Sequence, residues 1–137
     1  MNRRKAREYA LQMLFQHDFV GDRSGLEPAG DPWHDKKANE DLRKFARELV
    51  SGTLNHLEEI DRVVQEAAEH WKMERMAAVD RNILRFAVYE IMYRTDIPSA
   101  VTINEALEIA KKYSSLESVS FINGLLDKIA HAHGKSK

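Results

Sequence analysis

Residues 78–93 read AVDRNILRFAVYEIMY and carry the pattern that decides the fold. At about 100° per residue, the apolar side chains of this stretch lie around most of the helix circumference rather than along one stripe, and such a helix is buried on nearly all sides. The stretch is shorter than the roughly 20 apolar residues that span a bilayer. It is also interrupted by four charged residues, Asp80, Arg81, Arg85 and Glu90. We therefore predict a central helix with the other helices packed around it.

The segments on both sides of this helix also show apolar residues at three- and four-residue spacings, which predicts further helices. These are expected at about residues 2–18, 38–54, 57–71 and 117–131, with a turn or short helix at 72–77. Trp71 is expected on the inward, apolar face of the helix at 57–71. Thr102 and Glu105 match a capping box, which predicts the start of one more helix after Pro98. Gly52 interrupts a helical pattern at a cost of about 1 kcal/mol against alanine, so it predicts a close contact between helices.

The expected fold class is all-α, because no stretch shows sustained two-residue alternation. We predict about six to seven helices in two packed three-helix subdomains around the buried central helix, within one domain at 1–137. The subdomains are expected at about 1–72 and 73–137. Residues 19–37 hold three of the six glycines and two of the three prolines, which predicts a surface loop. Trp33 is expected to hold this loop onto the body of the protein.

The composition argues against several classes of chemistry. Cysteine is absent, which excludes disulfides, thiolate nucleophiles and cysteine-ligated zinc. The sequence has no glycine-rich phosphate loop, nucleophile elbow or HExxH motif. His56 and Glu59 stand in the reverse order for a metal-binding helix bundle, and no second copy follows. We expect no metal, no cofactor and no enzymatic activity. The basic start is not followed by an apolar signal segment, so a cytoplasmic protein without a membrane span is expected.

The charge is unevenly distributed, although the net charge is only −1. Residues 1–16 carry four basic side chains and one acid, whereas residues 40–69 carry eight acids and four bases. Arg3, Arg4 and Arg7 lie within reach of one another at the start of the first helix. They oppose the helix dipole there, so they form either a solvated terminus or a site for a polyanion.

Two further side chains have alternative interpretations. Phe121, at the start of the last helix, is placed either to stack on a nucleic-acid base or simply to close the core. Glu90 falls on an apolar arc of the central helix, where a carboxylate must be paired. We expect it to be buried and to contact Arg94 or an amide such as Asn104, without a catalytic role.

Four segments resemble one known family. VDRNILRFAVYEI (79–91), IPSAVTINEALEIAKKYSS (97–115) and SFINGLLDKIA (120–130) are similar to the C-terminal half of the NusB family of transcription antitermination factors. RRKAREYALQMLFQHD (3–18) resembles the arginine-rich first helix of that family. The resemblance implies an all-helical, non-catalytic protein. Such proteins bind single-stranded boxA RNA in nascent transcripts, notably ribosomal RNA leaders. They do so together with the ribosomal protein NusE, and they help RNA polymerase to read through terminators.

The resemblance also assigns roles to residues. It implies RNA contacts at Arg3, Arg4, Arg7, Glu117, Ser118 and Phe121, and contacts with NusE at Met76, Asp80 and Arg81. We expect the arginine-bearing helix start and Phe121 to lie side by side, as a single cradle for an unpaired strand. Binding by so few cations should be modest and sensitive to salt. The alternative is a helical protein–protein interaction module that does not bind RNA. The sequence leaves open whether the protein is a monomer or a homodimer.

Overall fold

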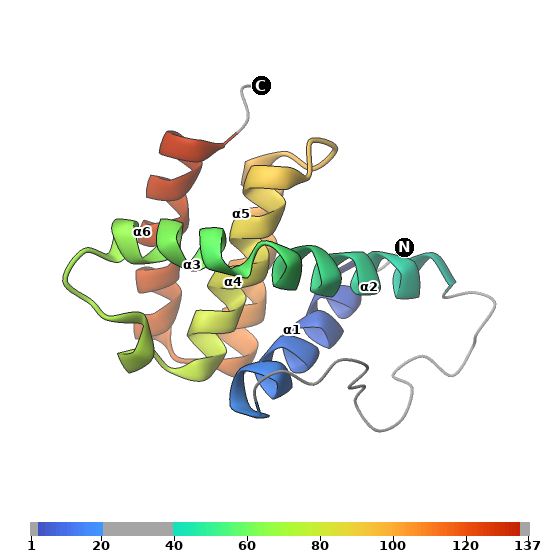
Figure 1. The fold of residues 1–137 in the computed structure, drawn as a ribbon, viewed down its shortest axis with the longest axis horizontal. Helices are drawn as coiled ribbons and strands as arrows, with labels where there is room; N and C mark the ends of the chain where they lie inside the picture. The colour runs from blue at the N-terminus through green and yellow to red at the C-terminus, as the bar shows by residue number, and fades with distance from the viewer. Residues whose placement is uncertain (1–2, 21–39, 135–137) are drawn as a thin grey trace.

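The computed structural model describes residues 3–20 and 40–134. These form six α-helices and one 3₁₀ turn: α1 Arg3–Val20, α2 Glu40–Asn55, α3 Leu57–Ala68, η1 Met73–Arg75, α4 Ala78–Tyr93, α5 Ser99–Tyr113 and α6 Leu116–His133 (Figure 1). The two described ranges contain no strand, which confirms the all-α class. None of their helices has the length and apolar character needed to cross a membrane. Most of the expected surface loop, including Trp33, lies outside the described residues.

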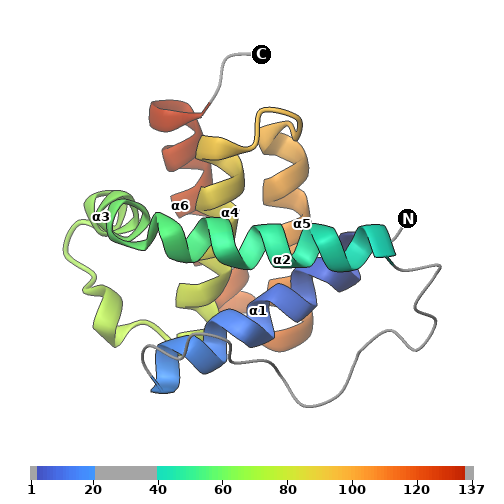
Figure 2. The ribbon, with the colours of Figure 1, turned by 45° about the vertical axis from the view of Figure 1, so that its right-hand side comes forward.

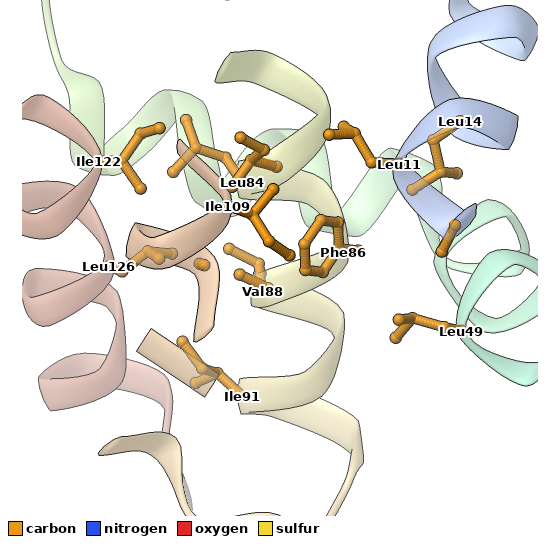
Figure 3. Close-up of a cluster of buried hydrophobic side chains, with 14 of the residues drawn as sticks. Leu11, Leu14, Leu49, Leu84, Phe86, Val88, Ile91, Ile109, Ile122 and Leu126 are labelled. Carbon is orange, nitrogen blue, oxygen red and sulfur yellow. The ribbon is translucent and has the colours of Figure 1, made fainter. Parts of the chain in front are cut away.

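Helix α4 is the centre of the molecule, and all five other α-helices contact it. Figure 2 shows α4, α5 and α6 running alongside one another, with α1 and α2 crossing over α4 on one side. Side chains from different faces of α4, such as Leu84, Phe86 and Ile91, are fully buried. Figure 3 shows the α4 side chains between Ile122 and Leu126 on α6 and the apolar face of α1. The prediction of a central helix buried on nearly all sides is confirmed.

The helices form the two expected groups, α1–α3 and α4–α6. Helix α4 contacts the helices of both groups. Helix α3 packs against α4 and α6 as well as against α2. The subdomain boundary near residue 72 therefore stays a prediction.

At Gly52, α2 lies directly against the side chain of Tyr89 on α4. A β-carbon at this position would collide with the ring of Tyr89. The Tyr89 ring is held in place by neighbouring rings, with centroids 5.6 Å from Tyr93 and 6.2 Å from His56. The close helix contact predicted from Gly52 is confirmed.

The predicted capping box at Thr102 and Glu105 is wrong. Helix α5 already begins at Ser99, directly after Pro98, whose φ of −63° suits a helix start. Thr102 and Glu105 therefore lie inside the helix, and both side chains contact other helices. A serine does begin α6, because the Ser115 hydroxyl accepts a hydrogen bond from the backbone N–H of Ser118 at 3.1 Å.

The predicted third helix is too long, and the inward orientation of Trp71 is wrong. Helix α3 ends at Ala68, and Glu69 adopts a φ of 56°, which turns the chain away from the helix axis. As a result Trp71 is 53% exposed rather than part of the core.

Candidate nucleic-acid interface

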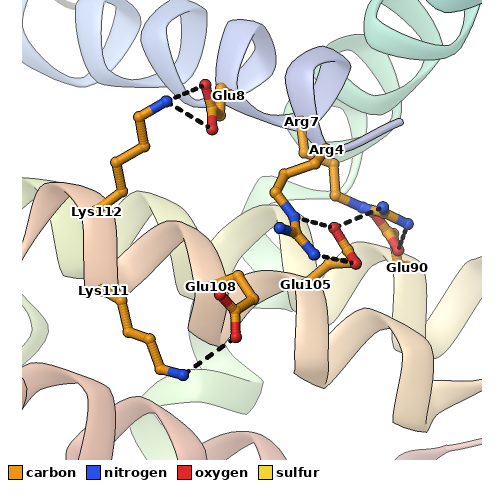
Figure 4. A network of polar contacts seen from close by, with 8 residues as sticks. All are labelled: Arg4, Arg7, Glu8, Glu90, Glu105, Glu108, Lys111 and Lys112. Atoms are coloured by element: carbon orange, nitrogen blue, oxygen red, sulfur yellow. Dashed lines mark hydrogen bonds and ion pairs between the residues drawn. The ribbon is translucent and has the colours of Figure 1, made fainter. Parts of the chain in front are cut away.

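Arg7, which the resemblance assigned to RNA, is part of the core, and its predicted contact with RNA stays a prediction. Its side chain is 3% exposed, and its Nε and Nη2 atoms donate to the two carboxylate oxygens of Glu90 at 2.7 and 2.9 Å (Figure 4). The Thr102 hydroxyl donates to the same carboxylate at 2.6 Å. Glu90 is fully buried, as predicted. The partners in these hydrogen bonds are Arg7 and Thr102 rather than Arg94 or Asn104.

Arg4 and Arg3 remain at the surface. Arg4 is 43% exposed and makes a bidentate ion pair with Glu105 at 2.7 and 2.9 Å, and this pair lowers the pKa of Glu105. The Arg3 guanidinium lies 4.3 Å from the centroid of the Phe45 ring. The packing of these two side chains fixes their position, so that they present charge at a defined place beside α5.

These arginines border an open hollow of about 870 Å³ between α1 and the start of α5, which we call the basic hollow. Its charged lining consists of five cations and three carboxylates: Arg3, Arg4, Lys5, Arg7, Lys112, Glu8, Asp96 and Glu105. Because Arg7 is neutralised by Glu90, the basic hollow is only weakly positive. Its charge suffices to neutralise only a small number of phosphates.

Phe121 lines a different and smaller cavity of about 240 Å³, just beyond the end of α5, which we call the aromatic cavity. Its lining is Trp71, Met76, Ala77, Asp80, Ser115, Glu117, Ser118 and Phe121. The structure therefore brings together three residues that the resemblance assigned to RNA with two that it assigned to NusE.

Asp80 joins the two sets within the aromatic cavity. Its carboxylate is 6% exposed and accepts hydrogen bonds from the hydroxyls of Ser114 at 2.7 Å and Ser118 at 2.6 Å. These bonds tie the first turn of α4 to the α5–α6 turn and to the first turn of α6. The position of Phe121 is thereby fixed relative to that of Met76.

The structure shows two hollows where the sequence predicted a single cradle. Arg4 and Phe121 line separate hollows that share no residue. The basic hollow extends along the α1–α5 seam as far as Lys112, and the aromatic cavity begins three residues later, at Ser115. A strand that contacts both Arg4 and Phe121 would therefore follow the α1–α5 seam past Lys112 to reach the aromatic cavity.

Arg81 serves mainly to anchor other segments. It pairs with Asp18 at the end of α1 and donates to the backbone carbonyls of Met73 and Met76 at 2.9 and 3.0 Å. Burial opposes ionisation of Asp18, but hydrogen bonds from Asn82 and Arg81, together with nearby arginine charge, lower the pKa of Asp18. These contacts fix the end of α1 against the start of α4.

Two exposed aromatic features were missed by the sequence reasoning. Phe15 and Phe19 stack with their ring planes nearly parallel on the outer face of α1, and Phe19 is 84% exposed. Their four-residue spacing on one helix face was the available signal. Trp71 was assigned to the core, yet it packs against Phe121 at the surface with a centroid distance of 6.2 Å.

Comparisons with known proteins agree with this architecture. The family model described as "NusB family" matches residues 4–131. The chain is 46% identical to the transcription antitermination protein NusB of Thermodesulfovibrio yellowstonii, over 99% of this chain and 98% of that protein. It superposes on the structure of T. maritima NusB with a TM-score of 0.82 and 42% identity, covering 98% of this chain and 94% of the other.

A second structure, described as the antitermination factors NusB and NusE in complex with dsRNA, contains a similar chain. It matches with a TM-score of 0.78 and 26% identity, covering 95% of this chain and 96% of the other. The family match includes every helix that builds the basic hollow and the aromatic cavity, and the helices have the same arrangement in the solved structures. The chain therefore belongs to the NusB family.

Proposed function

We propose that this protein is a transcription antitermination factor that binds single-stranded, boxA-type RNA of nascent transcripts together with NusE. It acts in the cytoplasm by binding, without catalysis, and supports processive elongation by RNA polymerase. The relatives named transcription antitermination protein NusB support this assignment, as does the solved complex of NusB, NusE and dsRNA.

One observation carries the proposal, namely the meeting of the expected RNA and NusE residues in the aromatic cavity. Phe121 offers a ring on which an unstacked base can stack, and Ser118 offers a hydroxyl beside it. Met76 and Asp80 form the adjoining wall. Because Asp80 bonds Ser118 directly, a partner bound at one wall and RNA bound at the other are energetically coupled, and this coupling is reciprocal.

The NusE surface extends from this wall to the end of α1. Exposed apolar patches with a polar rim mark protein–protein contacts, and aromatic residues are enriched in such contacts. The stacked pair Phe15 and Phe19 has these properties, and the Asp18–Arg81 pair holds it next to α4. We assign Phe15 and Phe19 to NusE in addition to Met76 and Asp80.

The basic hollow contributes phosphate contacts through Arg3 and Arg4. Such contacts position the strand without reading its sequence. Replacing Arg4 with alanine should weaken binding to boxA RNA and lower the salt slope by about one unit. Replacing Arg47, an exposed arginine on α2 outside both hollows, should leave the slope unchanged and serves as the charge-matched control.

Fluorescence anisotropy with labelled boxA RNA and a scrambled RNA, each with and without NusE, tests the proposal. We expect modest preference for boxA by the protein alone and a clear gain in affinity when NusE is present. Equal binding of the two RNAs with NusE present would refute boxA recognition. Binding of NusE without any RNA binding would instead support the alternative of a protein–protein interaction module.

A further inference from the structure

The aromatic cavity has the wrong charge for a phosphate. Its lining contains two carboxylates, Asp80 and Glu117, and no lysine, arginine or histidine. A phosphate would lose its hydration there and face like charge. The group that enters must therefore be uncharged or a donor of hydrogen bonds, and the strand's phosphates must stay outside.

The cavity is also small and flanked by aromatic rings. Its volume of about 240 Å³ is below the roughly 300–1,000 Å³ of pockets that enclose drug-sized ligands, so it suits a single ring system. Trp71 and Phe121 border it with their ring planes inclined at 59°. A planar base can stack on either ring, and such stacking tolerates any base.

Trp71 is held in place even though its side chain is exposed. Its backbone N–H donates to the carbonyl of Ala68 at 3.1 Å, and its carbonyl accepts from the Gln65 side chain at 2.9 Å. The other end of the Gln65 amide accepts from the backbone N–H of Met73 at 2.9 Å. Three hydrogen bonds therefore fix the backbone around Trp71, which places its exposed apolar side chain at a defined position beside the cavity, as a preorganised binding surface requires.

We propose that the aromatic cavity binds one unstacked RNA base that carries an exocyclic amino group, stacked on the ring of Trp71, which packs against Phe121. The amino group donates to the exposed carboxylate of Glu117, with Asp80 at the rear of the cavity. Carboxylate side chains accept hydrogen bonds from the N4 amino group of cytosine, whereas uracil has an acceptor, O4, at the same place. Cytosine thus binds and uracil is disfavoured. This inference rests on the proposed function, because it presupposes a single-stranded RNA ligand.

Tryptophan fluorescence provides the test. The sequence has two tryptophans, so the variant Trp33→Phe leaves Trp71 as the only one. This protein is titrated at neutral pH with short oligocytidylate and with oligouridylate of the same length. We expect oligocytidylate to quench the fluorescence of Trp71 and to bind about tenfold more tightly than oligouridylate.

A second set of variants separates stacking from general packing. Trp71→Ala should bind oligocytidylate roughly fivefold to hundredfold more weakly, and Trp71→Phe should restore most of the affinity. Leu116→Ala is the matched control, because Leu116 is an exposed apolar residue next to the cavity that does not line it. Unchanged thermal unfolding of each variant shows that the fold is intact.

The outcomes distinguish this inference from the function on which it rests. Equal affinity for the two oligonucleotides would refute the proposal that the cavity recognises an amino group on the base. If boxA RNA binds in the presence of NusE while Trp71 fluorescence stays constant, base binding in this cavity is refuted and the proposed function stands. If no RNA binds even with NusE, both are refuted.

Discussion

Replacing Arg7 with methionine should destabilise the protein strongly. The variant Arg7→Met keeps an apolar side chain of similar length in the core but removes the guanidinium that neutralises Glu90. Both side chains are almost completely buried, with 3% and 0% exposure, and their two hydrogen bonds measure 2.7 and 2.9 Å. Removing one partner of such a pair leaves an uncompensated buried charge, which costs about 3–5 kcal/mol.

The entropy of unfolding, which scales with the number of residues, determines how far this loss of free energy shifts the midpoint of thermal unfolding. With 137 residues at about 2.1 cal/mol/K per residue, the entropy of unfolding is roughly 0.29 kcal/mol/K. Arg7→Met should therefore lower the midpoint of thermal unfolding by roughly 10–17 °C. Glu108→Ala is the control, because it breaks the solvent-exposed pair between Glu108 and Lys111 and should cost less than about 1 kcal/mol.

Calorimetry and urea unfolding of a double-mutant cycle would measure the effect. The variant Arg7→Met/Glu90→Met replaces the whole pair with apolar side chains and should recover much of the loss, since buried ion pairs exchange for apolar groups at little net cost. The reasoning would be refuted by a loss below about 1 kcal/mol in Arg7→Met. If the Arg7→Met protein were fully stable but bound RNA more weakly, the result would instead show that Arg7 contacts RNA.

Three further predictions concern glycines and pH. Gly52→Ala should lose about 1–2 kcal/mol in urea unfolding despite its better helix propensity, because the new methyl group displaces the Tyr89 ring, and the same substitution made in a Tyr89→Ala protein should cost much less. Gly124→Ala, on an exposed helix face where an added β-carbon meets nothing, should gain up to about 1 kcal/mol in the same assay; a loss would show that the site is not open. The pKa of Asp18 is lowered from its ordinary value of 3.8. The ion pairs of Asp18 therefore stabilise the fold fully at pH values above 3.8, and this stabilisation is lost as the pH falls through the lowered pKa. Asp18→Asn should therefore be less stable than the parent at neutral pH, and the difference should shrink on acidification; a difference independent of pH would exclude this charge as the cause.

Features contained within one stretch of sequence were predictable. The all-round apolar pattern of residues 78–93 predicted α4, because a helix buried on every side shows this in its own composition. Gly52 predicted a helix contact because a glycine inside a helix needs a steric reason. Phe121, Ser118 and Asp80 were assigned by resemblance, and the structure places all three at one cavity.

Features that depend on contacts between distant residues were not predictable. Arg7 and Glu90 are 83 positions apart, so nothing near Arg7 distinguishes a core arginine from a surface one. The helical spacing continues through Trp71, but the left-handed backbone at Glu69 ends the helix before it. The separation of Arg4 from Phe121 follows from the packing of α1 along α5, which only the tertiary structure defines.

The position of α4 at the centre of the core has a consequence for how the chain folds as it is synthesised. When a ribosome has released only the residues up to the end of α3, the apolar faces of α1 and α2 have no α4 to pack against. The core closes only when α6 has also emerged, because α6 covers another side of α4. The nascent chain must therefore stay unfolded, or be held by a chaperone, until almost all of it is outside the exit tunnel.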